Sequence, residues 1–138
     1  FLEHKSEKDI LLIAGNTPHI IEDESIYYMG NLTQKQLYSL YKASEFFLHL
    51  GFLDCCPNVV VDARACGAKI ICTTSGGTQE VAGPDAILIE EPEWDFKPLD
   101  LYNPPKINFD KKLDNNWNID YNMKVVSNKY LKFMENNL

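Results

Sequence analysis

Short apolar runs alternate with stretches of helical pattern over most of the chain. A strand that is buried on both faces reads as a continuous apolar run, and such strands belong to parallel sheets that are covered by helices. Because strand-like and helix-like segments alternate, the pattern predicts an α/β fold with a doubly wound parallel sheet. The predicted strands are 9–14, 26–29, 45–50, 69–73 and 86–89.

Two segments between these strands are predicted to be helices. Thr33 is a favourable N-cap residue for a helix over 34–43. The segment 57–67 contains three consecutive valines and would be a strand by propensity alone. However, Pro57 suits the first turn of a helix, Gly67 suits its C-terminal end, and strands are predicted on both sides. We therefore predict that this segment is helical.

The chain changes in character beyond the last predicted strand. Prolines, charges and aromatic residues follow one another there without a sustained period. We expect an irregular segment over 91–118 that wraps over the domain through Trp94, Phe96 and Tyr102. A final helix is predicted over 119–136, because apolar residues recur there at helical spacing.

Length and charge narrow the classes of function. A chain of 138 residues is about one domain. It has 13 basic and 20 acidic residues, which give a net charge of -7. Nucleic-acid binding needs a basic surface, and so does docking on anionic lipid through charge alone, so we expect neither. No apolar run approaches the ~20 residues of a membrane span, so we expect no transmembrane segment.

The four cysteines lie close together, at Cys55, Cys56, Cys66 and Cys72. Zinc sites usually contain paired cysteines two to four residues apart or additional histidines, and this spacing gives neither. We therefore expect reduced thiols in a cytoplasmic protein, and no metal site.

Two polar segments follow predicted strands. The first is DCCPNVVVDARACG, from Asp54 to Gly67, and the second is SGGTQE, from Ser75 to Glu80. Ligands of open α/β sheets bind beyond the carboxyl ends of the strands. A helix that begins near Pro57 directs unpaired amides and its positive dipole end into this region, which suits a diphosphate. Gly-Gly in the second segment lets backbone amides approach phosphate oxygens closely.

These segments resemble the donor-binding signature of the retaining GT-B glycosyltransferases. The family pattern is E-G-F-P-N-x-x-x-E-A-x-A-x-G, followed by a strand and a G-G-x-x-E loop. Asp54 and Asp62 stand at the two acidic positions, and the resemblance covers roughly 9–89, the order of the strands included. It implies that 1–138 is the C-terminal, nucleotide-sugar-binding domain of such an enzyme, one half of a GT-B fold with a Rossmann-like sheet.

The resemblance also implies a reaction and a set of site residues. The reaction transfers a hexose from a nucleotide-diphosphate sugar to an acceptor hydroxyl, as in polysaccharide biosynthesis, with retained anomeric configuration and without a metal or other cofactor. Asp54 would orient the sugar and is the candidate catalytic residue, and Asp62 would accept hydrogen bonds from the ribose. The other residues expected to contact the donor are Pro57, Asn58, Val59, Gly76, Gly77 and Thr78.

The chain departs from the family pattern in several places. Both acids are Asp where the family usually has Glu, so each carboxylate reaches about one C–C bond, ~1.5 Å, less far. Cys55 and Cys56 replace a glycine and a bulky aromatic residue. We also expect that the chain begins after the first strand–helix unit, which carries the family's diphosphate-binding Arg and Lys, and after the N-terminal acceptor-binding domain. The fragment alone is therefore expected to be inactive.

Other functions stay open on this sequence. The shorter acids and the altered Cys55–Cys56 pair are compatible with a nucleotide-sugar-binding or scaffold module that has lost catalysis. A nucleotide-sugar epimerase of the same fold is a second alternative. A glycoside hydrolase would use Asp54 and Asp62 as acid and base, but no other feature of the sequence favours it.

Overall fold

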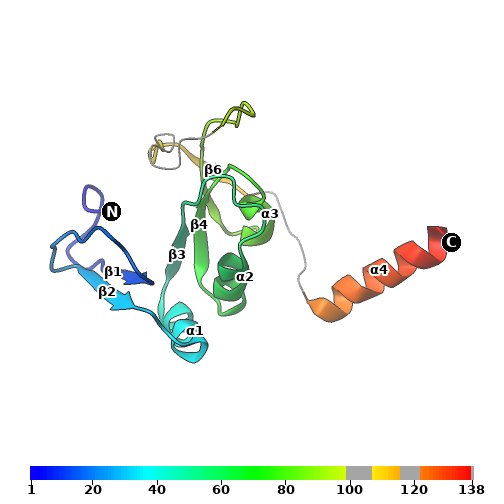
Figure 1. Ribbon diagram of the computed structural model, residues 1–138, viewed down its shortest axis with the longest axis horizontal. Helices are drawn as coiled ribbons and strands as arrows, with labels where there is room; N and C mark the ends of the chain where they lie inside the picture. The colour runs from blue at the N-terminus through cyan, green and yellow to red at the C-terminus, as the bar shows by residue number, and fades with distance from the viewer. Residues whose placement is uncertain (99–106, 116–121, 138) are drawn as a thin grey trace. The chain divides into compact units, whose positions relative to one another are not determined.

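The structure is a computed structural model that describes residues 1–98, 107–115 and 122–137 (Figure 1). The chain divides into two compact units, Phe1–Leu40 and Tyr41–Leu138. Parallel strands alternate with helices along the chain, which confirms the α/β class expected from the apolar pattern. The strands are distributed over two sheets, one in each unit.

The first unit contains a two-stranded parallel sheet. β1 (Leu11–Ala14) pairs with β2 (Ile26–Gly30), and both lie where their apolar runs predicted strands. The chain then enters α1 (Gln34–Ala43), which has the predicted bounds. Thr33 caps this helix: its amide donates to Gln36 Oε1 at 2.9 Å, and the Gln36 amide donates to Thr33 Oγ1 at 3.4 Å. This reciprocal pair is a capping box.

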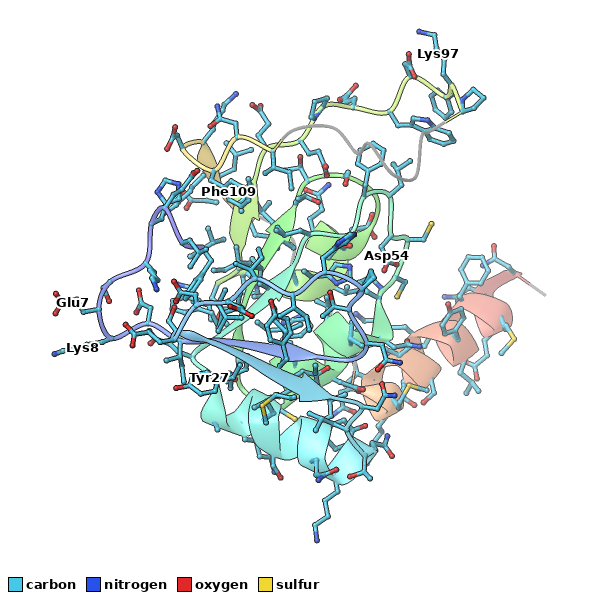
Figure 2. The ribbon with its side chains drawn as sticks, turned by 60° about the vertical axis from the view of Figure 1, so that its left-hand side comes forward. Glu7, Lys8, Tyr27, Asp54, Lys97 and Phe109 are labelled. Atoms are coloured by element: carbon cyan, nitrogen blue, oxygen red, sulfur yellow. The ribbon has the colours of Figure 1, made fainter. Side chains whose placement is uncertain are left out.

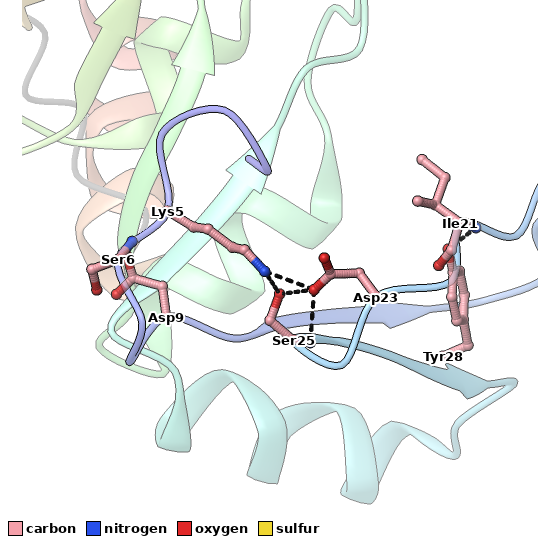
Figure 3. A network of polar contacts seen from close by, with 7 residues as sticks. All are labelled: Lys5, Ser6, Asp9, Ile21, Asp23, Ser25 and Tyr28. Carbon is pink, nitrogen blue, oxygen red and sulfur yellow. Dashed lines mark hydrogen bonds and ion pairs between the residues drawn. The ribbon is translucent and has the colours of Figure 1, made fainter.

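A polar network joins the N-terminal segment to the turn before β2 (Figure 3). Lys5 Nζ lies 2.7 Å from Asp23 Oδ1 and donates a hydrogen bond of 2.6 Å to Ser25 Oγ. The hydrogen bond from Lys5, with further ones from Ser25, holds the pKa of the Asp23 carboxyl well below its usual range. The network therefore fixes the turn through which the chain enters β2.

The second unit contains a four-stranded sheet in the order β3-β4-β5-β6. β3 (Phe46–His49), β4 (Lys69–Thr73) and β5 (Ile87–Ile89) are parallel, and β6 (Lys112–Asp114) runs antiparallel to β5. The parallel strands agree with the predicted ones to within two residues at each end. Cys72 on β4 is fully buried, and this burial raises the pKa of its thiol to about 11.

The segment with three consecutive valines is a helix, as predicted. α2 runs over Asn58–Ala65, and Pro57 precedes it as the N-cap residue with φ -70°. Val60 and Ala63 are completely buried where α2 packs against β4, β3 and the short helix α3 (Thr78–Ala82). Its place between two parallel strands outweighs the β-propensity of valine.

Two short elements, α3 and β6, are not predicted by the sequence pattern. Five residues make α3 too short to show a helical period. All three residues of β6 are exposed, so the strand carries no apolar face that a sequence pattern could reveal. Because β6 lies within 91–118, our expectation of a wholly irregular segment is wrong for Lys112–Asp114.

The expected wrapping through aromatic residues is wrong for Phe96, which is largely exposed. The rings of Trp94 and Phe96 pack on each other, with centroids 4.9 Å apart, and Phe96 is 83% exposed. The indole of Trp94 donates to the backbone oxygen of Lys97. These contacts lie within the turn itself and help to order it. Tyr102 lies outside the described residues.

The C-terminal helix is present as α4 (Met123–Asn137), which agrees with the helix predicted over 119–136 except that 119–121 lie outside the described residues. Within the described ranges, none of the helices has the length and apolar character needed to cross a membrane.

Candidate functional site

The loops that follow β3 and β4 lie at the same edge of the sheet, because the two strands are parallel. The first loop (50–57) leads from β3 to α2, and the second loop (74–77) leads from β4 to α3. Asp54, which is labelled in Figure 2, lies in the first loop. Ligands of α/β sheets bind at this edge, so the structure places the predicted site residues on the elements expected for a binding site.

Hydrogen bonds fasten the first loop to the second. The backbone oxygen of Asp54 accepts hydrogen bonds from the Gly77 amide at 3.0 Å and from Thr78 Oγ1 at 3.3 Å. One residue earlier, the Leu53 amide donates to Ser75 Oγ at 3.3 Å. The structure thus brings together Asp54, Gly77 and Thr78, three of the residues that the sequence analysis assigned to the site.

The two glycines of the second loop make this contact possible. Gly76 has φ +68°, and a Cβ there would lie 2.5 Å from the backbone oxygen of Asp54. At Gly77, a Cβ would lie 3.1 Å from the carbonyl carbon of Cys55 and would overlap with its oxygen. We expected these glycines to let amides approach a phosphate. In the structure, the close approach is to the first loop, and the Gly77 amide already donates to Asp54.

The carboxylate of Asp54 lies at the entrance to α2. Its Oδ1 accepts a hydrogen bond of 3.3 Å from the Cys56 amide, and its Oδ2 lies 3.3 Å from His49 Nε2. The side chain is 40% exposed, so part of the carboxylate stays open to solvent. A carboxylate held in this way can accept hydrogen bonds from the hydroxyls of a ligand.

The remaining predicted residues are carried by α2. Pro57 is buried, whereas Asn58 and Val59 are exposed on the first turn. The N-cap residue Pro57 provides no side-chain hydrogen bond to the first amides of α2. Asp62 is half-buried one turn further along the helix. Asn58, Val59 and Asp62 therefore share one helix, and Pro57 caps the end of it whose dipole favours anions.

Sequence reasoning missed Glu91, a buried carboxylate behind the second loop. Glu91 is only 6% exposed, and Ser75 Oγ donates a short hydrogen bond to its Oε2. Its amide donates to Thr74 Oγ1 at 3.0 Å. Glu91 follows shortly after β5, at the edge of the sheet that carries the two loops, and this position was the available signal.

The backbone next to Asp54 is strained. Leu53 has φ +57°, in the left-handed region that non-glycine residues seldom adopt. Such a conformation costs about 1–3 kcal/mol and persists only where neighbouring contacts enforce it. Here the Leu53 amide is held by Ser75, which in turn is held by Glu91. The buried carboxylate thus supports the conformation of the loop that presents Asp54.

Arg64, near the C-terminal end of α2, connects this helix to α3. Its Nη1 donates to the backbone oxygen of Val81 at 3.2 Å. A Cβ on Gly83 would lie 2.5 Å from Arg64 Nε, so this glycine leaves room for the guanidinium group. The two helices that begin at the candidate site are therefore tied together.

The described residues contain no cluster of three or more His, Cys, Asp or Glu side chains that could hold a metal ion. The four cysteines are free, and the two in the first loop, Cys55 and Cys56, are exposed.

Comparison with protein families gives one match. Residues 2–96, which include both loops, α2 and α3, match the family model described as Glycosyl transferases group 1. No curated protein matches the chain, and no solved structure does.

Proposed function

The chain belongs to the group 1 glycosyl transferase family, and we propose that it binds the nucleotide-diphosphate sugar donor of a retaining transfer to an acceptor hydroxyl. In this proposal 1–138 is the C-terminal half of a GT-B fold, and the transferred sugar is a hexose. A second α/β domain binds the acceptor, so we expect the chain alone to bind the nucleotide and to transfer no sugar.

The contact between the two loops is the observation that carries the proposal. It holds the backbone of Asp54 through Gly77 and Thr78 and leaves the carboxylate beside the start of α2. The sugar hydroxyls would hydrogen bond to Asp54. The diphosphate would lie at Asn58 and Val59, where the first amides and the dipole of α2 meet the charge that builds on the leaving group. Asp62 would accept hydrogen bonds from the ribose.

This arrangement assigns no role to a metal, because fixed amides can neutralise the departing diphosphate. The four free cysteines support a reducing compartment such as the cytoplasm. A place in polysaccharide biosynthesis is part of the same proposal and rests on the family.

Titration calorimetry with UDP, GDP and ADP, in the presence of EDTA, tests the proposal. We expect weak binding of one nucleotide, which is reduced by Asp62→Asn and unchanged by Asp110→Asn, an exposed acid outside both loops. No heat with any nucleotide, in a sample whose thermal unfolding shows that it is folded, would contradict it.

A catalytically inactive binding module is a second candidate function. It is favoured by the Gly77 amide and the Thr78 hydroxyl, which donate to Asp54 instead of pointing to a ligand. Release of nucleoside diphosphate from a nucleotide sugar, measured on the chain together with its acceptor-binding domain, distinguishes the two. A change of sugar configuration without transfer would instead indicate an epimerase.

A further inference from the structure

His49 is the last residue of β3 and lies next to the predicted sugar-binding carboxylate. Its Nε2 is 3.3 Å from Asp54 Oδ2, within ion-pair distance. The imidazole side chain is 17% exposed, and Nε2 itself is shielded from solvent and makes no hydrogen bond of good geometry within the described residues. A buried polar atom of this kind is rare in proteins and calls for a reason.

The chain leaves space for the imidazole at this position. A Cβ on Gly51 would lie 3.0 Å from His49 Nε2, a tight contact that would require the ring to shift by a few tenths of an ångström. Gly51 does not have a positive φ, and its backbone therefore does not require glycine. The glycine at position 51 is thus explained by the space that it leaves for the His49 ring.

The carboxylate of Asp54 is approached from two sides. The Cys56 amide donates to Oδ1, and Nε2 of His49 faces Oδ2. The distance of 3.3 Å is within the range of a hydrogen bond, and contacts of this kind are often misaligned before a ligand binds. A carboxylate has about four lone-pair sites, so two donors from the protein leave two for the hydroxyls of a ligand.

We propose that His49 is a positioning residue, which donates from Nε2 to Asp54 Oδ2 and orients this carboxylate toward the sugar of the donor. The proposal rests on the proposed function, since it assumes that Asp54 binds the sugar. The short side chain of Asp54 makes orientation more important, because an aspartate has one rotatable bond fewer than glutamate with which to reach the ligand.

Paired affinity measurements test this role. The probe is whichever of UDP, GDP and ADP the wild-type chain binds, together with its glucose conjugate. In His49→Leu, which keeps an apolar group of similar bulk, we expect about a tenfold loss of affinity for the nucleotide sugar, because the carboxylate loses a charge-assisted hydrogen bond. The affinity for the nucleoside diphosphate should stay within about twofold.

Two further variants separate positioning from folding. His49→Gln places an amide nitrogen near the position of Nε2 and should restore most of the sugar-dependent affinity. Gly51→Ala retains His49 but displaces its ring, and should reproduce the loss in part. ¹⁵N NMR of the imidazole is a readout that needs no ligand. The Nε2 resonance of His49 should shift in Asp54→Asn and should not shift in Asp110→Asn.

The possible failures are distinguishable. If the wild type binds none of the probes, the proposed function is wrong and the positioning role falls with it. If the wild type binds but His49→Leu keeps its preference for the nucleotide sugar, only the positioning role is wrong. An equal loss for both probes in His49→Leu and His49→Gln would also overturn it, because it would indicate a purely structural histidine.

Discussion

The backbone oxygen of Asp54 accepts a hydrogen bond of 3.0 Å from the amide of Gly77, which is 23 residues further along the chain. Through this bond the loop after β3 is held against the loop after β4. The position of the candidate catalytic carboxylate therefore depends on a residue that does not touch the carboxylate itself.

Replacement of Gly77 should disrupt this contact. In Gly77→Ala the new methyl group overlaps with the Cys55 carbonyl, and such overpacking costs about 1–3 kcal/mol. We expect a lower unfolding free energy in urea and loss of nucleotide binding. The matched control is Gly67→Ala, where a Cβ meets nothing within 4 Å but φ is +95°. It should lose about 1–2 kcal/mol and still bind nucleotide; loss of binding in the control as well would show that the Gly77 effect is unspecific.

Ser75 and Glu91 should be strongly coupled. Ser75→Ala leaves a buried carboxylate without the hydroxyl that donates to it, and Glu91→Ala leaves the Ser75 hydroxyl with only Thr73 Oγ1, at 3.1 Å, as a possible acceptor. Each change should cost about 1–3 kcal/mol in the free energy of unfolding. A double-mutant cycle should give a coupling of about 0.5–3 kcal/mol. Glu90→Ala, at an exposed neighbour paired with Lys111, should change stability by no more than about 0.5 kcal/mol. Additive effects of the two buried changes would contradict the coupling.

Asn115 should be important for the stability of α3. Its Nδ2 donates to the backbone oxygens of Gln79 at 2.8 Å and Gly83 at 2.7 Å, and the residue is 5% exposed. Asn115→Ala removes both of these hydrogen bonds, although the Gly83 oxygen still accepts one from the Ala86 amide at 3.1 Å. We expect a loss of about 1–3 kcal/mol in chemical denaturation. Asn31→Ala, at an exposed asparagine before α1, serves as the control and should be nearly neutral. Equal stability of the two variants would contradict the bridging role.

The cysteines should differ in reactivity. Alkylation with iodoacetamide at pH 8 should modify the exposed Cys55 and Cys56, and a bound nucleotide should slow it because both lie in the first loop. Cys72 should react only after unfolding, because burial raises the pKa of its thiol from 9.0 to about 11. Mass spectrometry of the labelled peptides measures both effects; labelling of Cys72 in the folded protein would contradict its burial.

The same shift predicts how stability depends on pH. The pKa of Cys72 is higher in the folded than in the unfolded chain, so the unfolded chain loses the proton first as the pH rises. The contribution of the neutral thiol to the unfolding free energy is complete below pH 9 and decreases between about pH 9 and 11. Cys72→Ala should flatten the decrease of unfolding free energy over this range, relative to the wild type. An unchanged slope would show that other groups cause it.

Much of the fold could be predicted because local signals agreed with each other. α1 has the predicted bounds because Thr33 marks its start. β4 also has the predicted bounds, because its apolar run lies between Gly67 and a polar loop. α2 was predictable from Pro57, in spite of its valines. β6 was not, because its short, exposed strand is stabilised by pairing with β5 instead of by an apolar face of its own.

The sequence proposes members for the candidate site but could not show the contacts between them. The sequence placed Asp54 and Gly77 at one edge of the sheet, since both follow parallel strands. It could not show that the Gly77 amide donates to Asp54, or that Glu91 supports Ser75, because such hydrogen bonds depend on how loops distant in sequence pack. The combined pattern around Asp54 and Asp62 predicts a nucleotide-sugar ligand, whereas the environment of His49 became visible only in three dimensions.

NMR titration of the ¹⁵N-labelled chain is the most direct test of the central claim, that a nucleotide sugar binds between the first loop and the N-terminus of α2. On addition of the nucleotide that binds in calorimetry, and of its glucose conjugate, the account predicts amide shifts clustered at residues 54–59 and 75–78. The glucose conjugate should add a shift at Asp54 that the nucleotide alone does not produce. Shifts that avoid both segments, or the same pattern in a variant with Asp54→Asn and Asp62→Asn combined, would contradict it.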